Sequence, residues 1–265
     1  MKERYRIISY NILEGWGDET LGGRALLPGA ERRAAAYAWL ARRRPAVVGL
    51  QELCGFTEAQ LGRDALNWGH GHSAFLDCGY SMGVTARSPI EVVEKKRDMH
   101  HGLLHVRIDG IDMLVTHFTP HGQRQEERRR EVAIVLDRVY RARLAAQPCL
   151  LMGDLNALSP QDDHLIGDAC MAWYPSDWPR IDGRPEYYAI QALLDGGLVD
   201  PWAKHRDPDL AGFAERPRYD FTLISADLAA HSVDAHYWQD AETDAWSDHW
   251  PVGVDLNWPL PLSGA

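Results

Sequence analysis

Short runs of apolar residues alternate along the chain with longer stretches in which apolar residues recur at helical spacing. Near the start, this pattern predicts a strand over 7–13, a helix over 29–44 that Pro45 ends, and a strand over 46–50. The chain is therefore expected to open with a strand, a helix and a second strand, as in a βαβ unit.

Strands and helices continue to alternate through the rest of the chain. Helices are predicted over 123–145 and 186–194, and Asp109-Gly110 predicts the turn of an antiparallel hairpin. Residues 157–185 lack periodicity and predict a long irregular segment. The remaining strands are predicted over 81–86, 103–108, 113–118, 149–152, 219–225, 233–238 and 250–257. Mixed strands with interspersed helices indicate an α/β or α+β fold.

Composition limits the class of protein. Of the 265 residues, 45% are apolar and 25% are charged, so one globular domain spanning 1–265 is expected. No apolar run approaches the about 18 residues of a membrane span and no signal peptide is visible, which predicts a cytoplasmic location. The widely spaced cysteines predict neither a zinc site nor a disulfide framework, and small buried side chains are expected at Cys54, Cys78, Cys149 and Cys170.

The formal net charge of −10 argues against nonspecific binding of nucleic acid, which a basic surface favours. A local basic stretch could outweigh this average, and the opening of the helix predicted over 123–145 contains several arginines. These arginines are expected mainly to form ion pairs on a solvated face, rather than to contact phosphate. Some of the acidic residues are expected to surround a metal ion.

Four of the apolar strands end in polar residues, and two more polar groups follow late in the chain. Strands buried between layers hold their ends rigidly, so functional groups from several strands can gather at one edge. Carboxylate and amide oxygens are suited to Mg²⁺ or Mn²⁺, and such an ion beside acidic and imidazole groups is suited to phosphate ester hydrolysis. In chain order these residues are Asn11, Glu52, His117, Asp154, Asn156, Asp220, Asp248 and His249.

The segments that carry these residues resemble the endonuclease/exonuclease/phosphatase superfamily, which includes the DNase I-like nucleases. A single motif such as that at 153–156 is weak, but six segments between Asn11 and His249 follow the family's order. The resemblance implies a four-layer α/β sandwich, in which helices flank two packed mixed β-sheets. It also implies a site at one edge of the sandwich, walled by 14–30, 55–80 and 157–185.

The same resemblance implies a role for each residue of the metal site. Asn11, Glu52 and Asp248 would bind Mg²⁺ or Mn²⁺, with Glu52 as the principal ligand. His249 would stabilise charge on the phosphoryl oxygens, and Asp220 would orient it. A carboxylate on one ring nitrogen also favours the cationic imidazolium on physical grounds.

For the remaining residues, the resemblance implies that Asp154 activates the attacking water and that Asn156 positions the phosphate. His117 would contact the phosphate or protonate the leaving group. His117 and Leu13 stand where abasic-site endonucleases of this superfamily carry Tyr and an acidic residue, so membership of that branch is not expected. Met82 replaces an Asn of many members, and the phosphate contact of that Asn is expected to be missing.

Metal-dependent hydrolysis of a phosphodiester or phosphomonoester in a small or modest-sized substrate is therefore the leading prediction. A nuclease or DNA-end phosphodiesterase is the alternative, with nucleic acid as the partner. A noncatalytic binding protein of the same fold is a third possibility, although the complete residue set argues against it. Further histidines are expected to be ordinary surface or core residues, with His121 the leading exception: His100, His101, His105 and His121.

Overall fold

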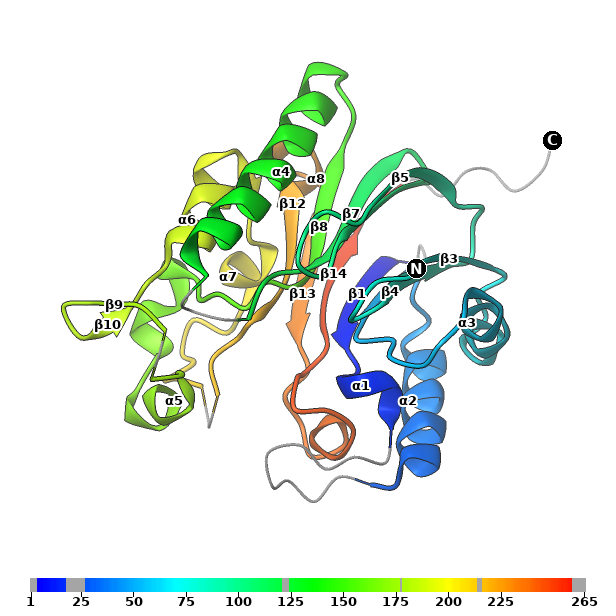
Figure 1. The fold of residues 1–265 in the computed structure, drawn as a ribbon, viewed down its shortest axis with the longest axis horizontal. Helices are drawn as coiled ribbons and strands as arrows, with labels where there is room; N and C mark the ends of the chain where they lie inside the picture. The colour runs from blue at the N-terminus through cyan, green and yellow to red at the C-terminus, as the bar shows by residue number, and fades with distance from the viewer. Residues whose placement is uncertain (1–3, 18–26, 121–123, 177, 214–215, 259–265) are drawn as a thin grey trace.

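The computed structural model describes residues 4–17, 27–120, 124–176, 178–213 and 216–258. Two six-stranded β-sheets pack face to face, and helices cover the outer surface of each sheet (Figure 1). This arrangement confirms the expected four-layer α/β sandwich. Within the described residues, no helix is long and apolar enough to cross a membrane.

The first sheet contains both the earliest and the latest strands of the chain. β1 and β2 run parallel because α2 (Gly29–Arg43) returns the chain between them, and the other neighbours are antiparallel. With α2, the helices α1 (Leu13–Trp16), α3 (Glu58–Ala65) and the 3₁₀ turn η1 (Leu66–Trp68) lie beside this sheet. The strand order is β13 (Ser232–Tyr237), β14 (Val252–Leu256), β1 (Tyr5–Asn11), β2 (Val47–Gln51), β4 (Met82–Ala86) and β3 (His72–Leu76).

The second sheet repeats this plan with a second parallel pair. β7 and β8 run parallel because α4 (Gln125–Leu144) connects them, and α4 and α6 (Tyr188–Asp195) cover the outer face. The predicted hairpin joins β6 to β7, and Asp109 and Gly110 both have positive φ, as a type I′ turn requires. The strand order is β11 (Leu198–Val199), β12 (Asp220–Ser225), β8 (Cys149–Asp154), β7 (Ile111–His117), β6 (Leu103–Ile108) and β5 (Glu91–Lys96).

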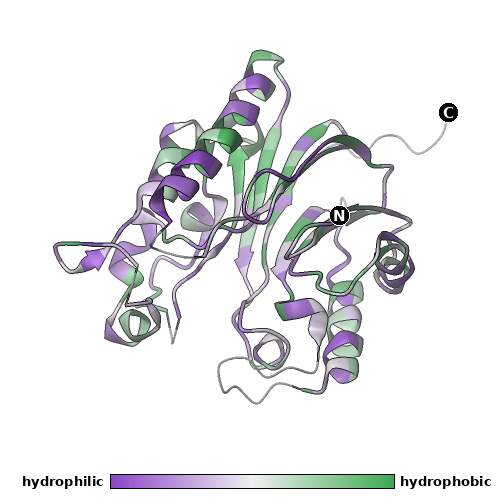
Figure 2. Cartoon of the chain, in the orientation of Figure 1, coloured by the Kyte–Doolittle hydropathy of each residue, from purple (hydrophilic) through white to green (hydrophobic). Residues whose placement is uncertain are grey.

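Successive side chains of a strand point to opposite faces of its sheet, one toward the other sheet and the next toward the helices. In β1, Ile7 packs between the sheets and Ile8 packs on the helical side. The central strands are accordingly mostly hydrophobic, whereas the helices show mixed colouring (Figure 2). The sheets approach closely at Gly49, where a Cβ atom would lie only 2.8 Å from the sulfur of Met152.

The segment 157–185 is more ordered than its sequence suggests. It forms the 3₁₀ helix η2, the helix α5 and a small hairpin, and its apolar residues pack with α7 (Pro201–His205) in a separate cluster. The prediction of an irregular segment is therefore wrong for most of it. These elements are η2 (Pro160–Leu165), α5 (Asp168–Trp173), β9 (Arg180–Ile181) and β10 (Arg184–Pro185), and the short helices α8 (Ala226–Ala229) and η3 (Thr243–Ala245) follow later.

The expectation that all four cysteines are buried is confirmed for two of them. Cys149 and Cys170 are buried, whereas Cys54 and Cys78 are half-buried, and all four are free thiols. Cys54 and Cys78 are partly exposed because they lie in the loops that follow β2 and β3, outside the packed layers.

Candidate active site

The register of the two parallel strand pairs brings four of the candidate residues to one edge of the sandwich. In the first sheet, Asn11 pairs with Gln51, the residue before Glu52. In the second sheet, His117 pairs with Asp154. Parallel strands end at the same edge of a sheet, and the two sheets are packed against each other, so the four side chains gather there.

Two antiparallel strands begin at the same edge. Asp220, the first residue of β12, lies directly opposite Asp154, the last residue of β8. The loop before β14 carries His249, whose backbone N–H donates a hydrogen bond to Ser247 Oγ over 3.1 Å. Ser247 Oγ in turn donates to the backbone carbonyl of Asn11 over 2.8 Å, which fixes this loop to the end of β1.

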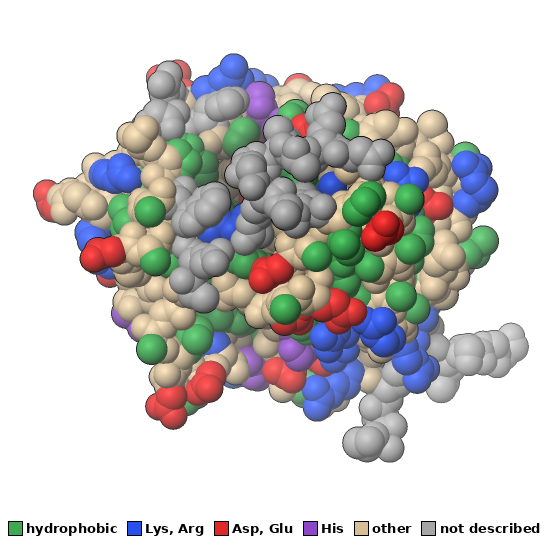
Figure 3. Space-filling model, turned by 90° about the horizontal axis from the view of Figure 1, so that it is seen from below, with side chains coloured by type: hydrophobic (Ala, Val, Ile, Leu, Met, Phe, Trp, Pro, Cys, Tyr) green, Lys and Arg blue, Asp and Glu red, His purple; other side chains and the backbone are tan. Residues whose placement is uncertain are grey.

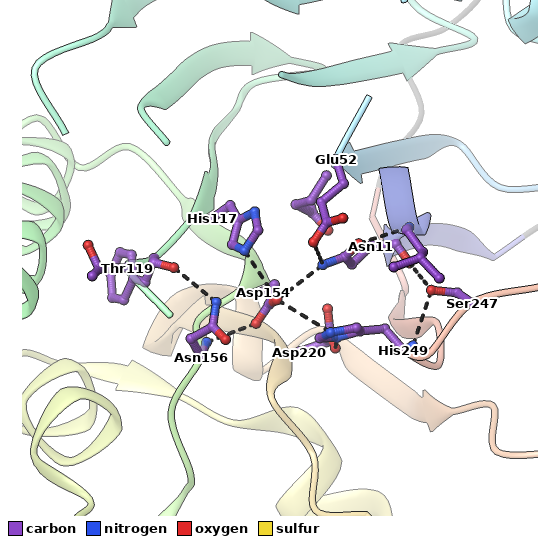
Figure 4. Close-up of polar contacts among 12 residues, drawn as sticks. Asn11, Glu52, His117, Thr119, Asp154, Asn156, Asp220, Ser247 and His249 are labelled. Carbon is purple, nitrogen blue, oxygen red and sulfur yellow. Dashed lines mark hydrogen bonds and ion pairs between the residues drawn. The ribbon is translucent and has the colours of Figure 1, made fainter. Parts of the chain in front are cut away.

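The carboxylates of Glu52 and Asp154 lie on either side of one amide (Figure 4). Asn11 Nδ2 donates to Glu52 Oε1 over 2.9 Å and to Asp154 Oδ2 over 3.1 Å. Burial raises the pKa of Glu52, and it raises the pKa of Asp154 to about 7. Asp248 adds a buried oxygen, Oδ1, that has no hydrogen-bond partner in the described part of the chain. Buried carboxylates with so few donors fit a divalent cation bound among them.

Two histidines face Asp154 from opposite sides and differ in charge. His249 Nδ1 lies 2.6 Å from Asp220 Oδ2, and its Nε2 lies 3.7 Å from Asp154 Oδ2. Burial alone would lower the pKa of His249, but the nearby carboxylates outweigh it and hold that pKa well above its ordinary value. His117 Nε2 lies 3.4 Å from Asp154 Oδ2, and burial lowers the pKa of His117 far below its ordinary value. The carboxylates therefore favour the cationic form of His249, whereas burial favours the neutral form of His117.

The segment 153–156 turns sharply after β8. Gly153 has φ of 149°, and a Cβ atom there would lie 1.8 Å from the carbonyl oxygen of Thr116, so only glycine fits. Asn156 donates from its backbone N–H to Asp154 Oδ1 over 2.9 Å, and from Nδ2 to the carbonyl of Phe118 over 2.9 Å. These contacts hold the Asp154 carboxylate in place.

A pocket of about 310 Å³ opens over these residues, and part of its wall differs from the sequence expectation. Tyr80 lines it, but no other residue of 55–80 does, and no described residue of 157–185 does, because the latter segment packs around its own cluster. His100 and His101, expected to be ordinary, also line it, whereas His121 lies outside the described residues. The lining residues are Leu13, Glu14, Glu52, Tyr80, His100, His101, His117, Pro120, Asp154, Asn156, Asp248 and His249.

Glu14 is an acidic residue of the pocket that the sequence analysis did not name. Leu13 stands where abasic-site endonucleases of the superfamily carry an acidic residue. The next residue, Glu14, lines the pocket and donates a hydrogen bond from its backbone N–H to Glu52 Oε2 over 3.0 Å. Both Leu13 and Glu14 have positive φ. The place of Glu14 shortly after Asn11 was the only signal for it in the sequence. Met82 is buried between the sheets.

The surface around the site carries both charges. Figure 3 shows the molecule from below in the view of Figure 1, and acidic and basic side chains are intermixed on this face. Three arginines of α4, Arg130, Arg138 and Arg141, form ion pairs with nearby carboxylates. Arg128 is an exception to the expected solvated face, because it is buried, donates to the carbonyl of Thr119 over 3.2 Å and lies 5.3 Å from the Trp178 ring. His105 pairs with Asp112, away from the pocket.

Several solved structures share this fold. An AP endonuclease from Archaeoglobus fulgidus is 19% identical with a TM-score of 0.67, covering 95% of this chain and 99% of its own. A 3′-5′ exonuclease (NExo) from Neisseria meningitidis is 18% identical with a TM-score of 0.68, covering 96% and 100%. An endonuclease/exonuclease/phosphatase from Beutenbergia cavernae DSM 12333 is 20% identical with a TM-score of 0.64, covering 96% and 72%. No curated protein matches the sequence.

The family model described as "Endonuclease/Exonuclease/phosphatase family" matches residues 8–249. This match spans most of the chain and includes every candidate residue from Asn11 to His249. It agrees with the two packed mixed sheets, the site at their common edge and the shared fold of the solved structures. The chain therefore belongs to the endonuclease/exonuclease/phosphatase family.

Proposed function

We propose that this chain is a divalent-metal-dependent phosphoesterase, in which an activated water attacks a phosphodiester or phosphomonoester in line. The observation that carries the proposal is the convergence of polar groups on Asp154. Its carboxylate accepts hydrogen bonds from Asn11 and Asn156 and faces the imidazoles of His117 and His249. A carboxylate held in this way can orient a water molecule and accept its proton.

Glu52, Asn11 and Asp248 would hold the cation, with Glu52 as the principal ligand. The bound ion would neutralise charge on the phosphate oxygens. Oxygen donors dominate this set, which suits Mg²⁺ or Mn²⁺. Two observations support this role: Asp248 Oδ1 is buried and has no hydrogen-bond partner among the described residues, and burial raises the pKa of Glu52.

The other residues act directly on the phosphate. His249, held by Asp220 as an imidazolium, stabilises the negative charge that grows on the phosphoryl oxygens during attack. Asn156 positions the phosphate from the turn after β8. His117 contacts the phosphate or the cation, because a neutral buried imidazole is a poor proton donor to a leaving group.

A substrate of small or modest size is favoured over duplex nucleic acid. The net charge is −10, and the face around the site is not continuously basic. A nuclease or DNA-end phosphodiesterase is the second candidate, because the solved structures of similar fold include an AP endonuclease and a 3′-5′ exonuclease. A noncatalytic binding protein is disfavoured because the whole residue set is present. A cytoplasmic location and a monomeric state stay predictions.

The proposal is tested by hydrolysis assays on nucleic acids, nucleotides, inositol phosphates, phospholipids and activated phosphodiesters and phosphomonoesters. We expect activity with added Mg²⁺ or Mn²⁺, its loss in EDTA, and a decrease in turnover of about 10² or more in Asp154→Asn. Activity that EDTA does not affect would contradict the metal requirement. No hydrolysis with either cation, combined with tight binding of a macromolecule, would instead support the binding-protein alternative.

A further inference from the structure

The cation pocket contains a nitrogen donor as well as oxygen donors. One ligand atom each from Glu52, His117 and Asp154 lie within 4.8 Å of one another. Donors around a single ion with bonds of about 2.1 Å lie up to roughly 4.2 Å apart, so small side-chain movements would bring all three to one ion. His117 is therefore within reach of a cation held by Glu52.

The surroundings of His117 leave a ring nitrogen available to such an ion. The side chain is 4% exposed, its Nε2 faces Asp154 at 3.4 Å, and its buried Nδ1 has no hydrogen-bond partner among the described residues. His249 differs, because its Nδ1 is bonded to Asp220 at 2.6 Å. A buried polar atom without a partner is costly, and a cation bound at Nδ1 would remove that cost while leaving Nε2 beside Asp154.

The ring of His117 is also held in one orientation. The His101 ring lies 4.3 Å from it at an interplanar angle of 30°, and the Tyr80 ring lies 6.2 Å from it on the pocket wall. Figure 4 shows the His117 ring beside Glu52 and Asp154, at the end of β7. A ligand fixed in this way needs little reordering to bind an ion.

We infer that His117 is an imidazole ligand of the catalytic cation, and that the site therefore selects a first-row transition ion over Mg²⁺. Mg²⁺ takes oxygen ligands almost exclusively, whereas imidazole nitrogen suits transition ions, with affinity rising from Mn²⁺ towards later members of the series. The inference rests on the proposed function, since it concerns the same cation. It goes beyond that function by assigning the ligand that decides the identity of the ion.

Calorimetric titration of the metal-free protein with Mn²⁺ and with Mg²⁺ tests the selectivity. We expect Mn²⁺ to bind at least about tenfold more tightly, and His117→Gln, which offers an oxygen in place of the nitrogen, to lose most of that ratio. His72→Gln is the matched control, because it removes an exposed imidazole at the start of β3, outside the pocket, and should keep the ratio. Equal affinity for both ions in the unmodified protein would overturn the inference.

Pulsed electron paramagnetic resonance of bound Mn²⁺ tests the ligand itself, without any substitution. Modulation from a directly bound imidazole ¹⁴N is expected in the unmodified protein and in His72→Gln, and it should vanish in His117→Gln. Bound Mn²⁺ that shows no ¹⁴N modulation, but is lost in Glu52→Gln, would overturn the role of His117 and leave the proposed function standing. Failure of the protein to bind either cation would overturn both.

Discussion

Two residues of the site, Glu52 and Asn156, have left-handed backbone conformations, with φ of 60° and 44°. Such conformations cost residues other than glycine on the order of 1–3 kcal/mol, and they persist where the surrounding structure enforces them. The carbonyl of Glu52 accepts hydrogen bonds from the N–H groups of Gly15 and Cys54, both over 2.7 Å. The strained residues therefore lie just after the ends of β2 and β8, where the chain turns and the side chains of the site enter the pocket.

Substitution of His249 and Asp220 measures whether they act as one unit. His249→Ala should lower turnover by about 10²–10³ with a smaller effect on KM, because it removes a donor that acts mainly in the transition state. Asp220→Asn keeps the shape but removes the charge that raises the pKa of His249. The imidazolium would then lose its proton at lower pH, so the alkaline limb of the pH–rate profile should move towards neutrality.

The double variant completes this test. Since both residues act through one imidazole, turnover of the double variant should be little lower than that of His249→Ala alone. Circular dichroism and thermal unfolding of all three variants control for loss of the fold. Strictly additive losses in turnover would show that Asp220 and His249 work independently.

At the level of elements, the buried strands are predictable from sequence and the exposed elements are not. Strands such as β2 and β8 are mainly apolar because both faces are covered, and this gives a strong local signal. β5 was missed because it lies at a sheet edge and four of its six residues are charged. α3 was missed although Thr57 caps it, its Oγ1 accepting from the N–H of Gln60 over 3.2 Å, because Gly62 interrupts its pattern.

The same distinction applies to the candidate site. The order of motifs along the chain identified all eight residues that the strand ends bring together, from Asn11 to His249. Of the pocket wall, Tyr80 lies in the segment 55–80 that was expected there, whereas His100 and His101 were not predicted, because they lie in a loop whose position depends on how the second sheet packs against the first. No local pattern marks a loop residue that tertiary packing alone moves to the site.

A buried ion cluster joins parts of the segment between β8 and β12, and it gives a prediction about stability. Arg218, before β12, lies 2.8 Å from Asp162 in η2 and 2.5 Å from Asp200 at the start of α7, and all three side chains are almost fully buried. Arg218→Met should lower the free energy of unfolding by roughly 3–5 kcal/mol, because it leaves the buried Asp200 without this cation and Asp162 with Arg206 alone. Chemical denaturation measures this change.

Two comparisons make the Arg218 prediction specific. Arg184→Met removes an exposed ion pair with Asp163 in the same segment and should leave the free energy of unfolding nearly unchanged. Adding Asp162→Asn and Asp200→Asn to Arg218→Met should recover part of the loss, since the uncompensated charges are then gone. A loss of similar size in Arg184→Met would mean that the cluster has no special role.

The stability of the whole molecule should depend on pH through His70. This side chain is fully buried, with Nε2 3.0 Å from the carbonyl of Pro45 and Nδ1 2.8 Å from Thr85 Oγ1. Burial lowers the pKa of His70 to about 4. Below its ordinary pKa of about 6.5, the unfolded chain therefore binds a proton that the folded chain does not. The free energy of unfolding should fall by about 3 kcal/mol as pH decreases from 6.5 to 4.

Urea unfolding of the metal-free protein at several pH values between 4 and 8 measures this dependence. His70→Gln retains a donor for the Pro45 carbonyl but does not titrate, so its free energy of unfolding should fall less steeply across the same interval. Above pH 7 the slopes of the two proteins should agree. Parallel curves at every pH would show that His70 does not contribute.

The pairing of β1 with β14 has a consequence for how the protein is made. Tyr5 pairs with Leu256 and Ile7 with Val254, so β1 needs a neighbour that is synthesised much later. Until β14 has been synthesised, one side of β1 stays open to pairing with other chains. The first sheet can therefore be completed only after β14 has left the ribosome. During that interval, the open edge of β1 exposes nascent chains to aggregation.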